Sequence, residues 1–276
     1  MAFRAMSSNE TLGDPATHFF KSGNALRAQS CDELGALVQK FPAHKIEYDI
    51  WYSSDDPDKV HGFVYTDVAN RLLYIRVADK QRCIDIMGEA AKSEITEHGE
   101  KMVAELAAGS DKYIGRTPSE QHDFVIFLPG TNIFDAIVKK DKLANAVKQG
   151  AKLKLHPLTA RPIRAELASA FGGDAIIDAR VSAHKLMAGA CIVGAFSNSE
   201  MGLVAAAQDK RVYLFNDLDR MCTYTAVYRA IREGDKLSRN KLLRVMSSTS
   251  SGFVSPEAAP DEYMDGFFNQ FEGQHV

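Results

Sequence analysis

The sequence predicts an α/β protein, with a doubly wound parallel sheet in its C-terminal part and a smaller α+β domain before it. Between residues 124 and 215, short apolar runs alternate with helical segments, as strands alternate with helices in parallel sheets. Between residues 45 and 77, three strand-like runs are joined by short polar links, which favours an antiparallel meander. Residues 108–121 are polar and contain two glycines and a proline. We therefore place one domain at residues 1–115 and a second at residues 116–276.

The elements of the first domain follow from its local patterns. A short amphipathic helix is expected from Cys31 to Phe41. A long helical pattern runs from Asp79 to Ala108 and ends at Gly109. The three strands between them are rich in aromatic and β-branched residues and are expected at Lys45–Tyr52, His61–Thr66 and Arg71–Val77.

The second domain alternates strands and helices. Strands are expected at Phe124–Leu128, Lys152–His156, Ala175–Ile177, Cys191–Phe196 and Arg211–Phe215. Helices are expected at Ile133–Gln149, up to Gly172, at Val181–Ala190, from Glu200, and through most of Met221–Leu243. The tail ends in four aromatic residues, which we expect to dock on the first domain: Tyr263, Phe267, Phe268 and Phe271.

Composition narrows the class of protein. With 45% hydrophobic and 25% charged residues among 276, the chain is typical of a globular protein with a sizeable core. No apolar run reaches eighteen residues and the start lacks the apolar core of a signal peptide, so we expect a cytoplasmic protein without a membrane span. The four cysteines form no CxxC pair, which argues against a zinc site and a disulfide framework.

The net charge of −3 gives no general indication of a nucleic-acid partner, yet basic residues gather in two stretches. Residues 139–164 contain eight basic residues and one acidic residue, and residues 229–244 contain six basic and two acidic residues. Such stretches are typical of solvated helix faces. The alternative is an electropositive cleft for a nucleotide or a polyanionic acceptor.

Polar residues follow three of the predicted parallel strands. Gly130 and Thr131 follow the first strand, His156 follows the second, and Ser197 to Glu200 follow the fourth. Ligands of doubly wound sheets bind beyond the carboxyl ends of the strands, so these residues are the candidate binding site.

The chemistry of these residues suits a phosphate. Pro157 holds His156 in extended backbone, and an imidazole there can donate to a phosphate and stabilise a departing diphosphate. Arg161 and Arg164 follow closely and are equally compatible with a surface position. Ser197, Asn198 and Ser199 precede a helix whose amino end favours anions, although helix capping alone explains them.

Two further roles are assigned from residue type. Glu200 suits a carboxylate that accepts hydrogen bonds from ribose hydroxyls, or simply an acidic residue in a first helical turn. Carboxylates of the first domain are candidate general bases, and the sequence does not rank them: Asp49, Asp55, Asp56, Asp67 and Asp79. Asp55 and Asp56 are also compatible with an exposed turn before Pro57.

The segments Lys154-Leu-His-Pro-Leu158 and Cys191 to Phe215 resemble glycosyltransferases of the two-domain GT-B type, over about a quarter of the chain. The resemblance is to the bacterial sialyltransferase, polysialyltransferase and capsule-transferase branches. It implies that His156 contacts the donor phosphate and that Ser197, Ser199 and Glu200 contact phosphate or ribose. The acidic-glycine motif of the family's catalytic carboxylate is not matched, because Asp14 follows Gly13 and Asp55-Asp56 precede a proline.

We therefore expect a glycosyltransferase that moves a sugar from a nucleotide sugar to an acceptor hydroxyl on a glycan or a modified nucleic acid. The expected catalytic residues are His156 and one of Asp49, Asp55 and Asp56. The nucleotide sugar is a co-substrate, and neither a metal nor another cofactor is expected. The alternatives are a nucleotide-sugar epimerase and a non-catalytic nucleotide-binding or interaction protein.

Overall fold

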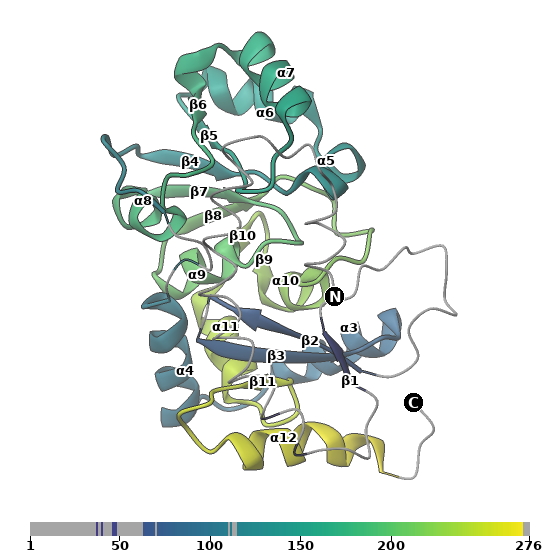
Figure 1. Cartoon of the computed structure of the whole chain (residues 1–276). Coiled ribbons are helices and arrows are strands. Elements are labelled where there is room, and N and C mark those ends of the chain that lie inside the picture. The colour runs from purple at the N-terminus through teal and green to yellow at the C-terminus, as the bar shows by residue number, and fades with distance from the viewer. Residues whose placement is uncertain are drawn as a thin grey trace.

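In the computed structural model, two sheets lie one above the other, each with its own helices (Figure 1). The structure describes residues 37, 40, 46–48, 63–69, 71–109, 111 and 115–272. The upper sheet has five strands and the lower sheet has four. The predicted fold class, a C-terminal doubly wound parallel sheet with a smaller N-terminal α+β part, is confirmed.

All neighbouring strands of the five-stranded sheet are parallel. The strands are β4 (Phe124–Phe127), β5 (Lys152–Lys154), β6 (Ile176–Ile177), β7 (Ile192–Ala195) and β8 (Arg211–Leu214). Their order is β6-β5-β4-β7-β8, so the first strand is central and the chain builds outward on one side before it crosses to the other. This is the 3-2-1-4-5 order of Rossmann-type sheets.

The connections of this sheet are helical. They contain α5 (Thr131–Ile137), α6 (Lys140–Lys148), α7 (Arg161–Phe171), α8 (Ala183–Gly189) and α9 (Met201–Ala207). The single helix predicted over residues 133–149 is wrong, since Val138 and Lys139 adopt extended backbone between α5 and α6. The Lys139 side chain forms an ion pair with Asp217 after β8.

The four-stranded sheet has the order β1-β2-β3-β11. Its strands are β1 (Ile46–Tyr48), β2 (Phe63–Val68), β3 (Leu72–Val77) and β11 (Phe253–Val254). The predicted antiparallel pairing holds for β2 and β3, but β1 runs parallel to β2. The predicted antiparallel meander is therefore wrong at this pair. Residues 49–62 are numerous enough for the crossover connection that a parallel pair requires.

Two helices follow β3 where the sequence predicts one. They are α3 (Lys80–Ala90) and α4 (Glu97–Ala107), separated by a turn. The Thr96 side chain accepts a hydrogen bond from the Gly99 N–H at 3.1 Å and so starts α4 afresh. The Thr96 N–H donates to the Ser247 hydroxyl at 2.9 Å, which fixes this new start to the C-terminal part of the chain.

The segment from Met221 to Leu243, predicted to be mostly helical, contains two helices separated by a hairpin. The elements are α10 (Thr225–Ile231), β9 (Arg232–Glu233), β10 (Lys236–Leu237) and α11 (Arg239–Ser247). Gly234 has a φ of +62° at the turn of the hairpin, in the left-handed region that favours glycine. The helical run ends earlier, at Ile231, where Arg232 adopts extended backbone.

The end of the chain returns to the four-stranded sheet. Strand β11 pairs antiparallel with β3, and α12 (Pro260–Phe268) follows it. The Phe63 ring on β2 meets the rings of Phe267, Phe268 and Phe271 with centroids 5.8, 5.0 and 5.1 Å away. The prediction that the C-terminal aromatic residues dock on the first domain is confirmed. The division of the chain between residues 115 and 116 stays a prediction.

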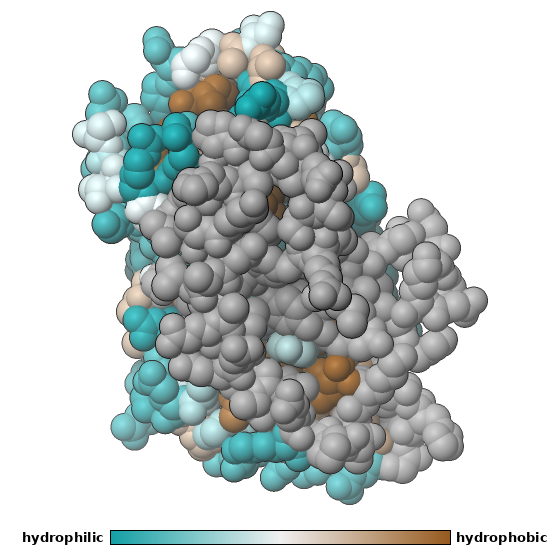
Figure 2. Space-filling view, in the orientation of Figure 1, coloured by the Kyte–Doolittle hydropathy of each residue, from teal (hydrophilic) through white to brown (hydrophobic). Residues whose placement is uncertain are grey.

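One hydrophobic cluster reaches from the lower sheet to the upper one, with members such as Leu73, Tyr228 and Val193. Helix α9 is buried along its whole length and packs against α4, α11 and β8. On the outer surface, α12 presents hydrophilic side chains along the bottom of the view (Figure 2). No helix in the described ranges has the length and apolar character needed to cross a bilayer.

Replacing Phe63 with alanine removes the ring at the centre of the aromatic contacts of α12. Phenylalanine-to-alanine changes in a core cost about 3–5 kcal/mol of unfolding free energy, and we expect Phe63→Ala to fall in that range. Chemical denaturation measures the loss. The exposed Ile95 provides the control, and Ile95→Ala should change the unfolding free energy by less than about 0.5 kcal/mol. Equal effects of the two substitutions would contradict the central place of Phe63.

Candidate functional site

The carboxyl ends of the parallel strands bring the predicted site residues to one edge of the sheet. In the register, Phe127 is opposite Lys154, Ile126 is opposite Gly194, and Ala195 is opposite Leu214. The loops after β4, β5, β7 and β8 therefore begin at similar heights. The chain reverses its direction of building between β4 and β7, and ligands of open α/β sheets bind at such a point.

His156 lies in the loop after β5 and is half-buried. Its Nδ1 accepts a hydrogen bond from the Leu158 N–H at 3.1 Å. A nitrogen that accepts carries no proton, so a neutral imidazole in this position carries its proton on Nε2. This tautomer makes Nε2 a hydrogen-bond donor, which is the role that binding of a phosphate requires.

Gly130 and Thr131 lie beside this loop, at the start of α5. Gly130 is buried and precedes the first helical residue. The Thr131 hydroxyl donates to the Leu158 carbonyl at 2.8 Å and accepts from the Ala160 N–H at 2.7 Å. The structure thus brings Gly130, Thr131 and His156 together. The Thr131 hydroxyl hydrogen is already used within the protein.

The loop ends at α7, where two arginines lie. Arg161 is the first residue of α7 and is exposed. Arg164 is half-buried, and its Nε donates to the Thr159 carbonyl at 2.8 Å. Thr159 itself is 1% exposed, and its hydroxyl has no hydrogen-bond partner within the described part of the chain. The start of α7 lacks a side-chain cap.

On the other side of the reversal, a buried amide holds the turn after β7. The Asn216 Oδ1 accepts from the Ser197 N–H at 2.8 Å, and the Asn216 Nδ2 donates to the Ser197 hydroxyl at 2.8 Å. Ser197 is fully buried and Asn216 is 5% exposed. The Ser197 carbonyl accepts from the Tyr224 N–H at 2.9 Å. Ser197 therefore holds the turn in place from the interior. A ligand at the surface would contact the residues next to Ser197 and not Ser197 itself.

The next three residues of the turn are half-buried. The Ser199 hydroxyl accepts from the Met201 N–H at 3.3 Å, so Ser199 caps α9 as its residue type suggests. Glu200 accepts from the Tyr224 hydroxyl at 3.4 Å. The Asn198 Oδ1 is enclosed and finds no hydrogen-bond partner among the residues described. Tyr228, whose pKa is raised by burial, donates to the Ser199 carbonyl.

The candidate general bases fall into two groups. Asp49, Asp55 and Asp56 lie outside the described residues. Of the other two, Asp67 is fully buried on β2, and Asp79 accepts from the Arg82 N–H at 2.6 Å as the cap of α3. Asp79 therefore has a complete structural explanation. No group of three or more metal-ligating side chains is found within the described ranges.

Lys154 carries a buried amine next to the His156 loop, 3% exposed at the end of β5. Its Nζ donates to the Leu155 carbonyl at 2.6 Å and to the Ala179 carbonyl at 3.0 Å. Burial lowers the pKa of Lys154 to about 7, although nearby Asp111 and Asp178 act in the opposite direction. The amine thus joins the end of β5 to the segment that follows β6.

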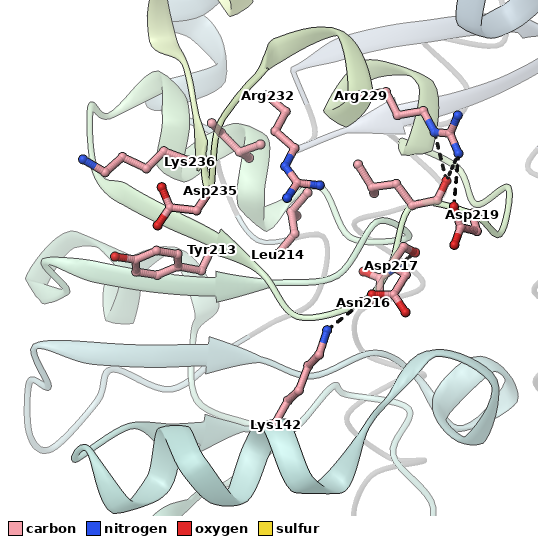
Figure 3. Close-up of a pocket in the computed structure, with 12 residues that line it drawn as sticks. Lys142, Tyr213, Leu214, Asn216, Asp217, Asp219, Arg229, Arg232, Asp235 and Lys236 are labelled. Carbon is pink, nitrogen blue, oxygen red and sulfur yellow. Dashed lines mark hydrogen bonds and ion pairs between the residues drawn. The ribbon is translucent and has the colours of Figure 1, made fainter.

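A hollow of about 510 Å³ opens beside the end of β8, next to Asn216. Figure 3 shows Arg232 pointing into it from the hairpin and Lys142 approaching Asp217 from α6. Most of its charges are engaged within the protein. Lys142 contacts Asp217 at 3.3 Å, and Arg229 contacts Asp219 at 3.7 Å and donates to the Leu218 carbonyl.

The two basic stretches also bond largely within the protein. In the first, Lys139 and Lys142 pair with Asp217, Lys140 pairs with Glu166, and Lys152 donates to the Asp174 carbonyl. In the second, Arg239 donates to the Ala207 carbonyl and Lys241 pairs with Glu233. These contacts fit the interpretation of solvated helix faces better than that of a polyanion-binding surface.

Sequence reasoning missed the groups that hold the site in place. Asn216 directly follows β8, so the rule that picked out Thr131 and His156 also applies to it. Tyr224 and Tyr228 lie in a helical segment, where periodicity marks them only as apolar. Lys154 looks like a solvent-facing lysine of an amphipathic strand, and only its position between β5 and the segment after β6 reveals the buried amine.

No protein-family model and no curated protein sequence matches the chain. Among solved structures, the chain is similar to the β-Kdo 2,7-transferase KpsC of Thermosulfurimonas dismutans, with 15% identity and a TM-score of 0.43. The match covers 85% of this chain and 89% of that one. A likeness of this extent does not assign an activity.

The buried amine of Lys154 makes stability depend on pH. Between pH 7 and the ordinary lysine pKa of 10.5, the unfolded chain holds a proton on Lys154 that the folded chain releases. The unfolding free energy therefore rises with pH in this window, by about 2 kcal/mol between pH 7 and pH 9 from this residue alone. Denaturation of wild type and Lys154→Met at both pH values measures the difference. The variant should lack this rise, while a variant of the exposed lysine, Lys148→Met, should keep it. An identical pH dependence of wild type and Lys154→Met would contradict the assignment.

Proposed function

We propose that the chain is a glycosyltransferase that binds a nucleotide-sugar donor at the carboxyl edge of the five-stranded sheet. One observation carries the nucleotide site: the strand order reverses between β4 and β7, and the predicted donor-binding residues lie on the loops that flank this point. The choice of sugar transfer rests on the resemblance of the His156-Pro157 and Ser197–Gly202 segments to GT-B glycosyltransferases.

Donor binding follows from the chemistry of the loops. His156 presents Nε2–H to a phosphate oxygen, because its Nδ1 is occupied by the Leu158 N–H. Arg161 adds a cation at the start of α7, and the positive end of the helix dipole there also favours an anion. On the other side, Glu200 offers its carboxylate oxygens to the ribose hydroxyls.

The proposed reaction is a direct displacement at the anomeric carbon of the donor. A carboxylate, one of Asp49, Asp55 and Asp56, takes the proton of the acceptor hydroxyl as its oxygen forms the new glycosidic bond. The bond from the anomeric carbon to the phosphate oxygen breaks, and the nucleotide leaves with the electron pair. His156 and Arg161 stabilise the negative charge that develops on that phosphate. The acceptor is a glycan that carries the attacking hydroxyl.

Nucleotide binding is tested by thermal and chemical denaturation with UDP, CMP, CDP, GDP and ADP. A nucleotide at one hundred times its dissociation constant adds about 2.7 kcal/mol to the unfolding free energy, so we expect a clear shift with one of them. His156→Ala should weaken that nucleotide about 10- to 100-fold, since hydrogen bonds to charged groups contribute about 1.5–3 kcal/mol. The control is His122→Ala, because His122 precedes β4 at the opposite edge. Absence of a shift with all five nucleotides would overturn the donor site.

Transfer is tested separately from binding, by single replacements of Asp49, Asp55 and Asp56 with asparagine. One variant should lose turnover of the nucleotide sugar by at least about 100-fold and keep the wild-type nucleotide affinity, because a general base contributes about 10²- to 10⁴-fold to rate. Release of nucleotide in the presence of acceptor measures turnover. Full turnover in all three variants would exclude these bases. Nucleotide binding without any turnover would instead support the non-catalytic alternative.

A further inference from the structure

The Thr131 hydroxyl is connected to the His156 ring through a single residue. It donates to the Leu158 carbonyl at 2.8 Å, and the N–H of the same Leu158 donates to His156 Nδ1 at 3.1 Å. Its oxygen also accepts from the Ala160 N–H at 2.7 Å, two residues further along the loop. One side chain on the β4 loop therefore holds the β5 loop on both sides of Thr159.

The rest of this loop is fixed as well, so the ring has a defined support. The Thr159 N–H donates to the His156 carbonyl at 3.0 Å, and Arg164 binds the Thr159 carbonyl from α7. From below, Lys154 binds the Leu155 carbonyl, and the Leu155 N–H donates to the Ile177 carbonyl at 3.1 Å. Among these contacts, the two made by Thr131 connect the loop to the central strand β4.

The chemistry of a threonine hydroxyl explains why it suits this position. A hydroxyl can donate one hydrogen bond and accept others at the same time. The Thr131 hydroxyl hydrogen is donated to the Leu158 carbonyl, and one lone pair of its oxygen accepts from the Ala160 N–H. Thr131 is thus occupied by the protein, in contrast to the direct contact with the donor that its place in the sequence suggests.

We propose that Thr131 is a positioning residue that sets the orientation and tautomer of His156 through Leu158. Thr131 holds the Leu158 carbonyl and so restricts the backbone of Leu158. This keeps the Leu158 N–H, on the other side of the Leu158 Cα, directed at Nδ1 and leaves the proton of the neutral ring on Nε2. The expected effect of Thr131 on donor affinity rests on the proposed function. The effect on the His156 tautomer follows from the protein's own contacts.

The test compares Thr131→Val, which replaces the hydroxyl by a methyl group of similar size, with Thr131→Ser, which keeps the hydroxyl. Nitrogen-15 NMR of the imidazoles reports which ring nitrogen carries the proton, and the His156→Ala spectrum assigns the signal of His156 among eight histidines. In wild type and Thr131→Ser, Nδ1 should be unprotonated. In Thr131→Val we expect a mixture of both tautomers. An unchanged tautomer in Thr131→Val, or a protonated Nδ1 in wild type, would overturn the proposal.

Nucleotide affinity is the second measurement, with whichever nucleotide of the five stabilises wild type. We expect Thr131→Val to weaken it about five- to tenfold, the effect of one hydrogen bond, and Thr131→Ser to bind as wild type does. Affinities are compared at a temperature where circular dichroism shows all variants folded. If Thr131→Val does not fold, Thr131→Ala takes its place, and the wild-type tautomer still tests the contact with Leu158. Wild type without nucleotide affinity would refute the donor site, whereas equal affinity in wild type and Thr131→Val would refute the role of Thr131.

Discussion

The pairing of β4 on both sides is the constraint on which the candidate site depends. Because β4 lies between β5 and β7 in parallel register, the loops that follow these strands start at one edge of the sheet. None of these loops is near the others in sequence. A slip of one residue in either ladder would turn the side chains of a strand to the opposite face and move its loop out of line. The geometry of the site is therefore set by main-chain hydrogen bonds inside the sheet.

Around this edge, buried or partly buried side chains hold the loops of the candidate site in place through hydrogen bonds. Asn216 fixes the turn after β7 through Ser197, and Thr131 fixes the loop after β5 through Leu158. Tyr224 extends the support to the lower sheet, since its ring stacks on Tyr74 of β3 at 6.0 Å. Buried hydrogen bonds of this kind restrict loop motion, which lowers the entropy lost when a ligand binds.

The sequence predicts the alternating part of the chain well, because apolar runs in a parallel sheet are buried on both faces and interrupt the helical pattern clearly. It predicts breaks within helices poorly. At the breaks, Lys139 contacts Asp217 and Thr96 contacts Ser247, and both partners are distant in sequence. For the site, strand ends identify Thr131, His156 and Ser197. Their division into outward-facing and supporting residues depends on partners such as Asn216, which only the fold brings near.

The return of β11 and α12 to the lower sheet bears on how the protein is synthesised. Phe253 pairs with Tyr74, and α12 covers Phe63, so the sheet formed by the early part of the chain receives an edge strand and an aromatic cover from the last part. During translation, β2 and β3 leave the ribosome long before these partners exist. Until then one edge and one apolar face are open, which are the features that molecular chaperones bind and that promote aggregation. The upper sheet differs, because all five of its strands lie before residue 215 and none of them pairs with a later segment.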